Sequence, residues 1–270
     1  MNSFSELRRS APGLARRALA SGIFLLSTTL AGGAQTPNDD AVQILKKMST
    51  YIGGQQTIQT TYDTDIEVIT DDLQKIQFAS SGQATLSRPD KLRVSRTGGY
   101  ADVELVFDGK KATLYGKNIG AYAQANFSGS VDQLVDKLRS EFGVEAPGAD
   151  LLLSRSFDDL MTGVYDAKHV GRGVIDGVEC EHLAFRATDT DWQIWVEVGA
   201  NPIPHKFVIT SKAVTGGPQY TLRIKDWKAN VQPAADTFTF RPAADAKEAD
   251  FRSLANVDEV PPGTPKGDKK

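Results

Sequence analysis

The 270-residue sequence is poor in the side chains that most often build covalent or metal-based sites, with one cysteine and three histidines. The single cysteine, Cys180, excludes an intramolecular disulfide, so the fold must rest on its apolar core. The formal net charge of -3 at pH 7 does not favour nucleic acid or an anionic membrane surface as a partner. The sequence also lacks a phosphate-binding loop, a dinucleotide fingerprint and an HExxH zinc motif.

Long apolar runs are equally scarce, and the one that stands out lies near the N-terminus. Arginine pairs precede an apolar stretch at residues 18–30, and small residues follow at 31–34. The stretch is short of the ~20 residues that a membrane-spanning helix needs. We therefore predict a signal peptide at residues 1–34, with cleavage after Ala34. Export by the Sec or the twin-arginine route stays open, and no transmembrane segment is expected in the mature chain.

Hydrophobic periodicity divides the first half of the mature chain into one helix and several long strands. Apolar residues recur at helical spacing from Ala41 to Ile52, and Gly53-Gly54 ends this helix. From Thr57 the period changes to two, which predicts antiparallel strands with one apolar and one wet face. The apolar positions of these strands are Ile58, Tyr62, Ile66, Val68, Ile76, Phe78, Leu86, Leu92, Val94, Val103, Leu105 and Phe107.

A helical insertion of about thirty residues interrupts the strands. Ser130 and Gln133 form a capping box for a helix whose apolar face includes Leu134 and Leu138. Further helical stretches near Ala149 and Ser156 carry Leu152 and Met161. Antiparallel strands then resume, with a hairpin turn at Asp176-Gly177. The predicted domain covers residues 35–245, and the polar, proline-bearing segment at 246–270 is predicted to be a disordered tail.

The order of these elements resembles the LolA-like fold of the periplasmic lipoprotein-carrier superfamily, including RPDKLR at 88–93 and FDGK at 107–110. The motifs CEHLAFR at 180–186, DWQIWVE at 191–197 and PIPHKFVIT at 202–210 resemble a family of predicted periplasmic proteins with that architecture. The resemblance implies a periplasmic α+β protein. It also implies a strongly curved antiparallel sheet, a half-barrel, whose concave face is covered by helices. In characterised relatives, the cargo is an acyl chain or another lipid.

These features together predict a non-catalytic protein that binds a lipid or acyl chain between the sheet and the helices. The expected lining consists of the apolar strand positions given above together with Leu134, Leu138, Leu152 and Met161. The same residues can instead pack as a solid core. In lipoprotein carriers, an arginine on an early strand hydrogen-bonds the lid, whereas residues 57–70 contain no Arg or Lys. A different latch, or no cycling lid, is therefore expected.

Two other functions stay open at this point. The first is a protein-interaction or envelope-sensing module on the same fold, which needs no ligand cavity. The second is a hydrolase, for which residue types exist but no G-x-S-x-G elbow. Cys180 and His182 share a strand face, yet two ligands do not make a zinc site, and no cofactor is expected. Trp192 and Trp195 should lie on opposite faces, one in the core and one on the surface.

Overall fold

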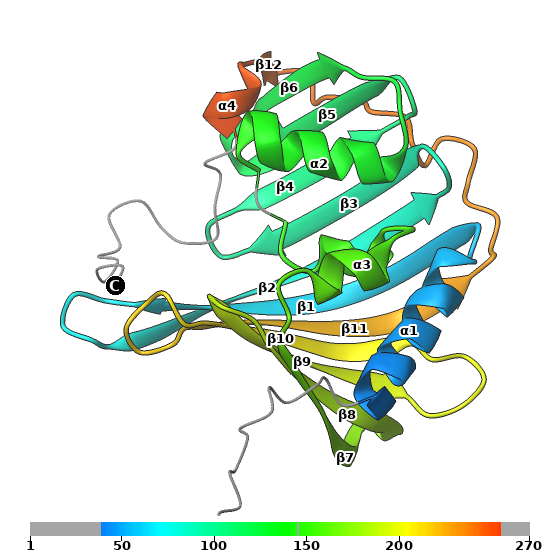
Figure 1. The fold of residues 1–270 in the computed structure, drawn as a ribbon. Helices are drawn as coiled ribbons and strands as arrows, with labels where there is room; N and C mark the ends of the chain where they lie inside the picture. The colour runs from blue at the N-terminus through cyan, green and yellow to red at the C-terminus, as the bar shows by residue number, and fades with distance from the viewer. Residues whose placement is uncertain (1–38, 145, 255–270) are drawn as a thin grey trace, which may run out of the picture. The chain divides into compact units, whose positions relative to one another are not determined.

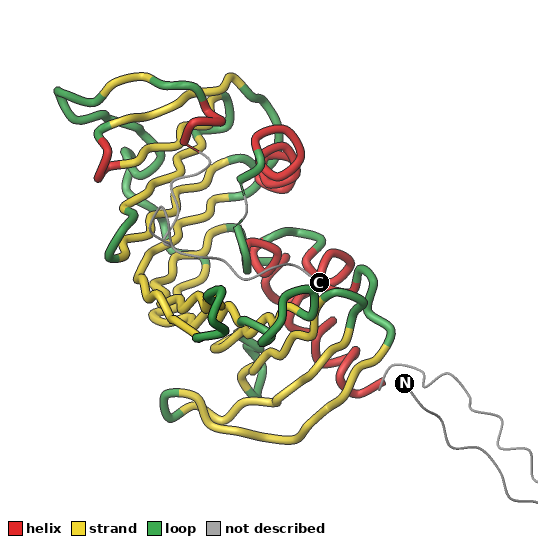
Figure 2. The backbone as a smooth tube through the Cα atoms, turned by 90° about the vertical axis from the view of Figure 1, so that its left-hand side faces the viewer, coloured by secondary structure: helices red, strands yellow, loops and turns green. Residues whose placement is uncertain are grey.

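The computed structural model describes residues 39–144 and 146–254, so the predicted signal peptide lies outside the described residues. One antiparallel sheet dominates this part of the chain, and it is curved and unclosed (Figures 1 and 2). The predicted α+β class is confirmed. Its strands are β1 (Thr57–Ile69), β2 (Lys75–Ser87), β3 (Lys91–Gly98), β4 (Asp102–Phe107), β5 (Lys111–Gly116), β6 (Ala121–Asn126), β7 (Asp166–Ile175), β8 (Val178–Arg186), β9 (Thr190–Glu197), β10 (Pro204–Ser211), β11 (Gln219–Ala229) and β12 (Lys247–Glu248).

The strand order joins two meanders at the middle of the sheet. In space the order is β12-β6-β5-β4-β3-β2-β1-β11-β10-β9-β8-β7, so consecutive strands are neighbours within β1 to β6 and within β7 to β11. The seam is the β1–β11 pair, which aligns Ile58 with Ala229 and Ile66 with Tyr220. The hairpin predicted at Asp176-Gly177 is confirmed, and both residues have the positive φ angles, 49° and 85°, that a tight turn of this kind requires.

The helices cover one face of the sheet, which we call the inner face (Figure 1). They are α1 (Asp39–Gly53), α2 (Val131–Phe142), α3 (Ser156–Met161) and α4 (Phe251–Leu254), with short 3-10 helices η1 (Lys117–Ile119) and η2 (Ala149–Leu152). The predicted capping box at the start of α2 is present, with Ser130 accepting from the Gln133 backbone and the Gln133 side chain accepting in return. The buried residues of α1 and α2 join those of the sheet in one hydrophobic cluster.

Residues 231–254 form a strap around the β6 edge of the sheet. On the outer face, Phe240 packs against Tyr115 and Tyr122 with ring centroids 5.6 and 5.3 Å apart. The chain then adds β12 parallel to β6 and reaches the inner face, where the ring of Phe251 packs against that of Phe142 in a tilted arrangement, with centroids 4.4 Å apart. The prediction of disorder from residue 246 is therefore wrong through residue 254. The polar pattern there hid a short segment held by backbone pairing and two apolar side chains, and residues 255–270 lie outside the described part.

We expect Leu254→Ala to lower the free energy of unfolding by about 2 kcal/mol, the lower end for a buried leucine, because the site lies in a short terminal helix. Leu254 is only 3% exposed and belongs to the hydrophobic cluster. Urea unfolding followed by circular dichroism measures the change, with the exposed Arg252→Ala as the matched control. Equal stability of the two variants would contradict an anchoring role for α4.

Candidate functional site

The inner face of β1 to β6 is defined by the pairing register, which aligns side chains in rows across the strands. The row nearest the helices reads Ile58, Leu86, Leu92, Phe107, Ala112 and Ala125. The next rows proceed along β1 through Thr60, Tyr62, Thr64, Ile66 and Val68. The predicted strand residues do share one face, as the period of two required.

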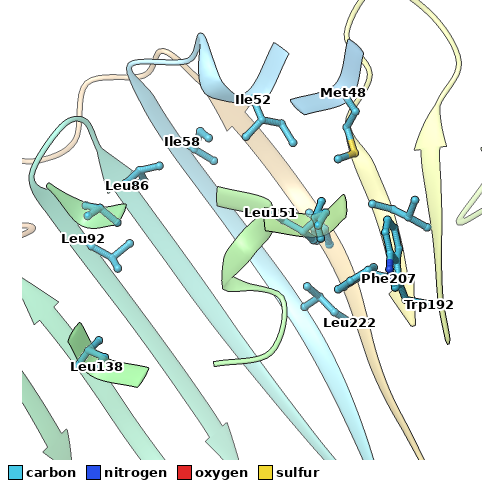
Figure 3. Close-up of a cluster of buried hydrophobic side chains, with 14 of the residues drawn as sticks. Met48, Ile52, Ile58, Leu86, Leu92, Leu138, Leu151, Trp192, Phe207 and Leu222 are labelled. Carbon is cyan, nitrogen blue, oxygen red and sulfur yellow. The ribbon is translucent and has the colours of Figure 1, made fainter. Parts of the chain in front are cut away.

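The predicted lining residues beneath the helices are packed as core. Figure 3 shows several of them converging from the sheet and the helices. Ile58, Leu86, Leu92, Phe107, Leu134 and Leu138 are all buried in the same cluster as residues of α1 and α2. Charged substitutions at these positions would test folding before they tested binding. Their role in holding a ligand stays a prediction.

A second group of the predicted residues lies at the margin of this core. Tyr62, Val94, Leu105, Leu152 and Met161 are partly buried and pack against the cluster. Tyr62 lies flat across β2, since a Cβ placed on Gly82 would overlap its ring. Its hydroxyl donates a hydrogen bond of 3.0 Å to the Ser95 carbonyl oxygen on β3. Tyr62 is therefore a clamp across two neighbouring strands.

The remaining predicted residues lie outside the cluster: Ile66, Val68, Ile76, Phe78 and Val103. Four of them occupy the β1–β2 hairpin, which extends past the helices (Figure 1). Ile66, Ile76 and Phe78 are partly exposed, and Phe78 packs edge-on against Tyr100, which is 55% exposed. We call Ile66, Val68, Ile76, Phe78 and Tyr100 the open end. Here the apolar inner face continues with Val68 buried and the other four residues left partly or largely exposed.

A polar belt separates the open end from the core, and we define it as Tyr62, Thr64, Ser80 and Arg96. Thr64 and Ser80 face each other across β1 and β2, and their buried hydroxyls are 2.6 Å apart. Arg96 pairs with Gly82, which pairs in turn with Tyr62, so it belongs to the same face. Sequence reasoning missed this belt. The signal was present as polar residues at Thr64, Ser80 and Arg96, where the apolar alternation fails.

Arg88 links the sheet to two of the covering helices. Its guanidinium donates hydrogen bonds to the Gln55 carbonyl at 3.1 Å, just after α1, and to the Leu152 carbonyl at 2.7 Å, in η2. The Ile52 carbonyl lies 3.5 Å from Nη2. Burial lowers the pKa of Arg88, and the nearby carboxylate of Asp132 opposes that shift. Arg88 therefore holds the end of β2 to α1 and η2. From the sequence, it was considered only as part of the RPDKLR motif at 88–93.

The three histidines considered for catalysis or metal binding each contact a different side chain. His169 contacts Glu181 at 2.7 Å, His182 contacts Gln193 at 2.9 Å, and His205 contacts Glu197 at 2.9 Å. In the part of the chain that the structure describes, no group of three or more His, Cys, Asp or Glu is placed to hold a metal ion.

Cys180 is buried, and the two tryptophans of β9 stack on neighbouring aromatic rings. Burial raises the pKa of the Cys180 thiol to about 11, so the reactive thiolate is scarce at neutral pH. Trp192 is buried and stacks on Phe185 at 3.9 Å, whereas the partly exposed Trp195 stacks on His182 at 4.1 Å. The predicted placement on opposite faces is confirmed.

The sequence matches one protein-family model, DUF2092, described as a predicted periplasmic protein, over residues 41–252. The chain belongs to this family. The DUF2092 match confirms the family resemblance and the periplasmic location inferred from the motifs. It also ends inside the strap, at α4, in agreement with a domain that continues beyond residue 245. No curated protein matches the sequence.

Solved structures with similar folds are distant in sequence from this DUF2092 protein. An uncharacterised conserved protein from Thermus thermophilus is 12% identical, with a TM-score of 0.45 over 78% of this chain and 99% of that one. LprF from Mycobacterium bovis is 13% identical, with a TM-score of 0.42 over 73% and 97%. The MucA/MucB complex of Pseudomonas aeruginosa gives 14% identity and a TM-score of 0.40 over 76% and 62%. Among the described residues, no helix is long and apolar enough to cross a membrane.

Proposed function

We propose that this protein binds a lipid or another amphiphile along the open end of the inner face, without catalysing a reaction on it. The observation that supports this is the continuation of the apolar face past the helices, with Ile66, Ile76 and Phe78 partly exposed and Tyr100 largely so. A contiguous exposed apolar surface on a protein of this kind is typical of a binding site rather than of a solvated face.

The open end is large enough to hold part of an acyl chain. The strand rises about 3.3 Å per residue, so β1 from Thr64 to Val68 spans about 13 Å. Each methylene removed from water contributes about 0.8 kcal/mol, so roughly eight methylenes supply about 6 kcal/mol before the costs of association. Such an affinity suits a reversible carrier or sensor better than permanent storage.

The turn next to the open end also exposes an apolar side chain. The hairpin tip carries Leu73, which is 65% exposed and has a positive φ of 66°. A non-glycine residue rarely adopts that conformation, and its side chain here projects apolar surface into solvent. Leu73 follows the acidic pair Asp71 and Asp72, so the hairpin tip combines an exposed apolar side chain with two well-hydrated carboxylates.

Native mass spectrometry of the exported chain, with palmitate and phosphatidylglycerol as probes, tests this proposal. We expect a 1:1 adduct with at least one probe, and an affinity about tenfold or more lower in Phe78→Glu, because a carboxylate would then be buried against the chain. The control is Val174→Glu, which places the same charge at a 67% exposed position on β7. No adduct with either probe would sink the proposal, and equal losses in both variants would point to a general effect of charge.

A protein-interaction module is the second candidate, because β7 is an edge strand with apolar side chains. It is the last strand in the sheet order, and Val170 and Val174 on it are 56% and 67% exposed. An unpaired strand edge can add a strand from a partner. The Val174→Glu variant therefore separates the two candidates, since it should impair strand addition and leave lipid binding intact.

A further inference from the structure

The β1–β2 hairpin places a leucine where the backbone favours glycine. Leu73 has a φ of 66° and is 65% exposed. The other non-glycine residues with positive φ in the described part of the chain are Asp176, Asp226 and Asn230, whose short polar side chains tolerate this conformation. Glycine adopts it at no steric cost, whereas leucine leaves an apolar side chain in solvent. The turn by itself therefore does not account for this leucine.

Hydrogen bonds around Thr70 hold the turn in one conformation. The Leu73 amide donates to the Thr70 carbonyl oxygen at 2.9 Å, and the Thr70 amide donates to the Gln74 carbonyl oxygen at 2.9 Å. The Gln74 amide donates to the Thr70 hydroxyl at 3.0 Å, and that hydroxyl donates to the Asp72 carboxylate. A side chain on a pre-organised turn loses little conformational entropy when a partner binds it. Leu73 is therefore a fixed apolar contact at the tip.

The hairpin that carries this turn is braced by its neighbours. Glu67 on β1 forms an ion pair with Lys75 on β2 at 2.9 Å and accepts a hydrogen bond from the Gln219 amide of β11 at 2.9 Å. Gly216, in the turn between β10 and β11, lies against Ile69, since an added Cβ would be 3.1 Å from the Ile69 Cδ1 atom. The two hairpins extend together past the helices (Figure 1). The tip is therefore a stiff projection from the sheet.

The same tip carries negative charge beside its apolar side chain. Asp71 and Asp72 are exposed, and neither forms an ion pair with a residue that the structure describes. The hydrogen bond from Thr70 lowers the pKa of Asp72, which keeps this carboxyl ionised at neutral pH. Lys75, the basic residue of this turn, is paired with Glu67. A surface that binds the tip must therefore accommodate an apolar group and carboxylates together.

We propose that this tip docks on another protein, whose matching surface has an apolar pocket for Leu73 and lysine or arginine side chains around it for Asp71 and Asp72. Charge complementarity favours such a partner, because a basic rim attracts the carboxylates and orients the two surfaces. A lipid surface suits the tip less well, since carboxylates are costly to bring into a bilayer and are repelled by anionic headgroups. Docking at the tip goes beyond ligand binding at the open end and does not depend on it.

Photo-crosslinking from position 73 of the exported chain identifies the partner, and calorimetry with the purified partner then measures the affinity. We expect Leu73→Gly to weaken binding at least about tenfold, because it removes the apolar contact. The same substitution should raise Tm by about 2 °C, since glycine relieves the strained backbone. A loss of affinity together with a gain of stability separates a binding role from a structural one.

Asp176→Gly is the matched control, since it makes the same kind of backbone change at the positive-φ position of the β7–β8 turn. It should leave the affinity unchanged. Asp71→Asn combined with Asp72→Asn keeps the side-chain size and should lower the affinity about tenfold. Added salt should weaken binding of the unmodified protein and have little further effect on this double variant.

Three results would overturn the proposal: no protein crosslinked from position 73, equal affinity in Leu73→Gly and the unmodified protein, or a crosslinked surface without basic side chains. Co-sedimentation with vesicles of phosphatidylethanolamine and phosphatidylglycerol that is lost in Leu73→Gly would also overturn it and assign the tip to a lipid surface. Adducts with palmitate or phosphatidylglycerol in native mass spectrometry should be unchanged in Leu73→Gly. Docking at the tip and lipid binding at the open end can therefore fail separately.

Discussion

Gly82→Ala is expected to destabilise the protein by about 3 kcal/mol, the upper part of the range for overpacking a filled site. Any Cβ at this position would overlap both the Ser95 carbonyl oxygen and the ring of Tyr62. The first of these is backbone of the neighbouring strand, so no side-chain rotation can relieve the overlap. Moving Tyr62 would also break its hydrogen bond to Ser95.

Thermal and urea unfolding measure this change, and Gly99→Ala is the control because a Cβ there meets no atom within 4 Å. A Gly82→Ala protein as stable as the control would show that β2 and β3 can separate locally at little cost. In that case the polar belt would be a pliable region and not a rigid floor.

Arg88→Met should cost a similar amount, about 3 kcal/mol, because it removes charge-assisted hydrogen bonds and leaves carbonyl groups at two helix ends without their donor. These carbonyls belong to Gln55 and Leu152, so the loss loosens α1 and η2 together. Hydrogen exchange followed by mass spectrometry should show faster exchange at both helices, beyond the change in global stability.

Arg88→Lys provides the graded comparison, since an ammonium group keeps the charge but cannot hold the planar fork that reaches two carbonyls. We expect its stability to lie between those of the unmodified protein and Arg88→Met. Equal exchange rates at α1 and η2 in all three proteins would mean that the apolar contacts of these helices hold them without the arginine.

Much of this architecture follows from local patterns in the sequence. The capping box at Ser130, the turn at Asp176-Gly177 and the opposite faces of Trp192 and Trp195 each depend on short-range geometry, and each is present in the structure. The period of two also placed the apolar strand residues on one face correctly. Such features need no knowledge of which strands are neighbours.

The candidate site was less predictable, because it depends on the register between distant segments. Sequence periodicity could not tell that Phe107 is fully buried while Phe78 is partly exposed, since both alternate in the same way. The role of Arg88 required the ends of α1 and η2 to meet the end of β2. The strap was missed because β12 is held by backbone pairing, which leaves little trace in side-chain chemistry.

The pairing of β1 with β11 determines how long one edge of the sheet stays unpaired while the chain is being synthesised and folded. β1 is the first strand to be synthesised, yet its partner β11 follows roughly 160 residues later, as the pairing of Tyr62 with Ile224 shows. Until β11 arrives, the meander from β1 to β6 has an unpaired edge, which is a template for aggregation. A newly exported chain therefore needs protection until its last long strand appears, and an interrupted chain would be the species that envelope chaperones and proteases encounter.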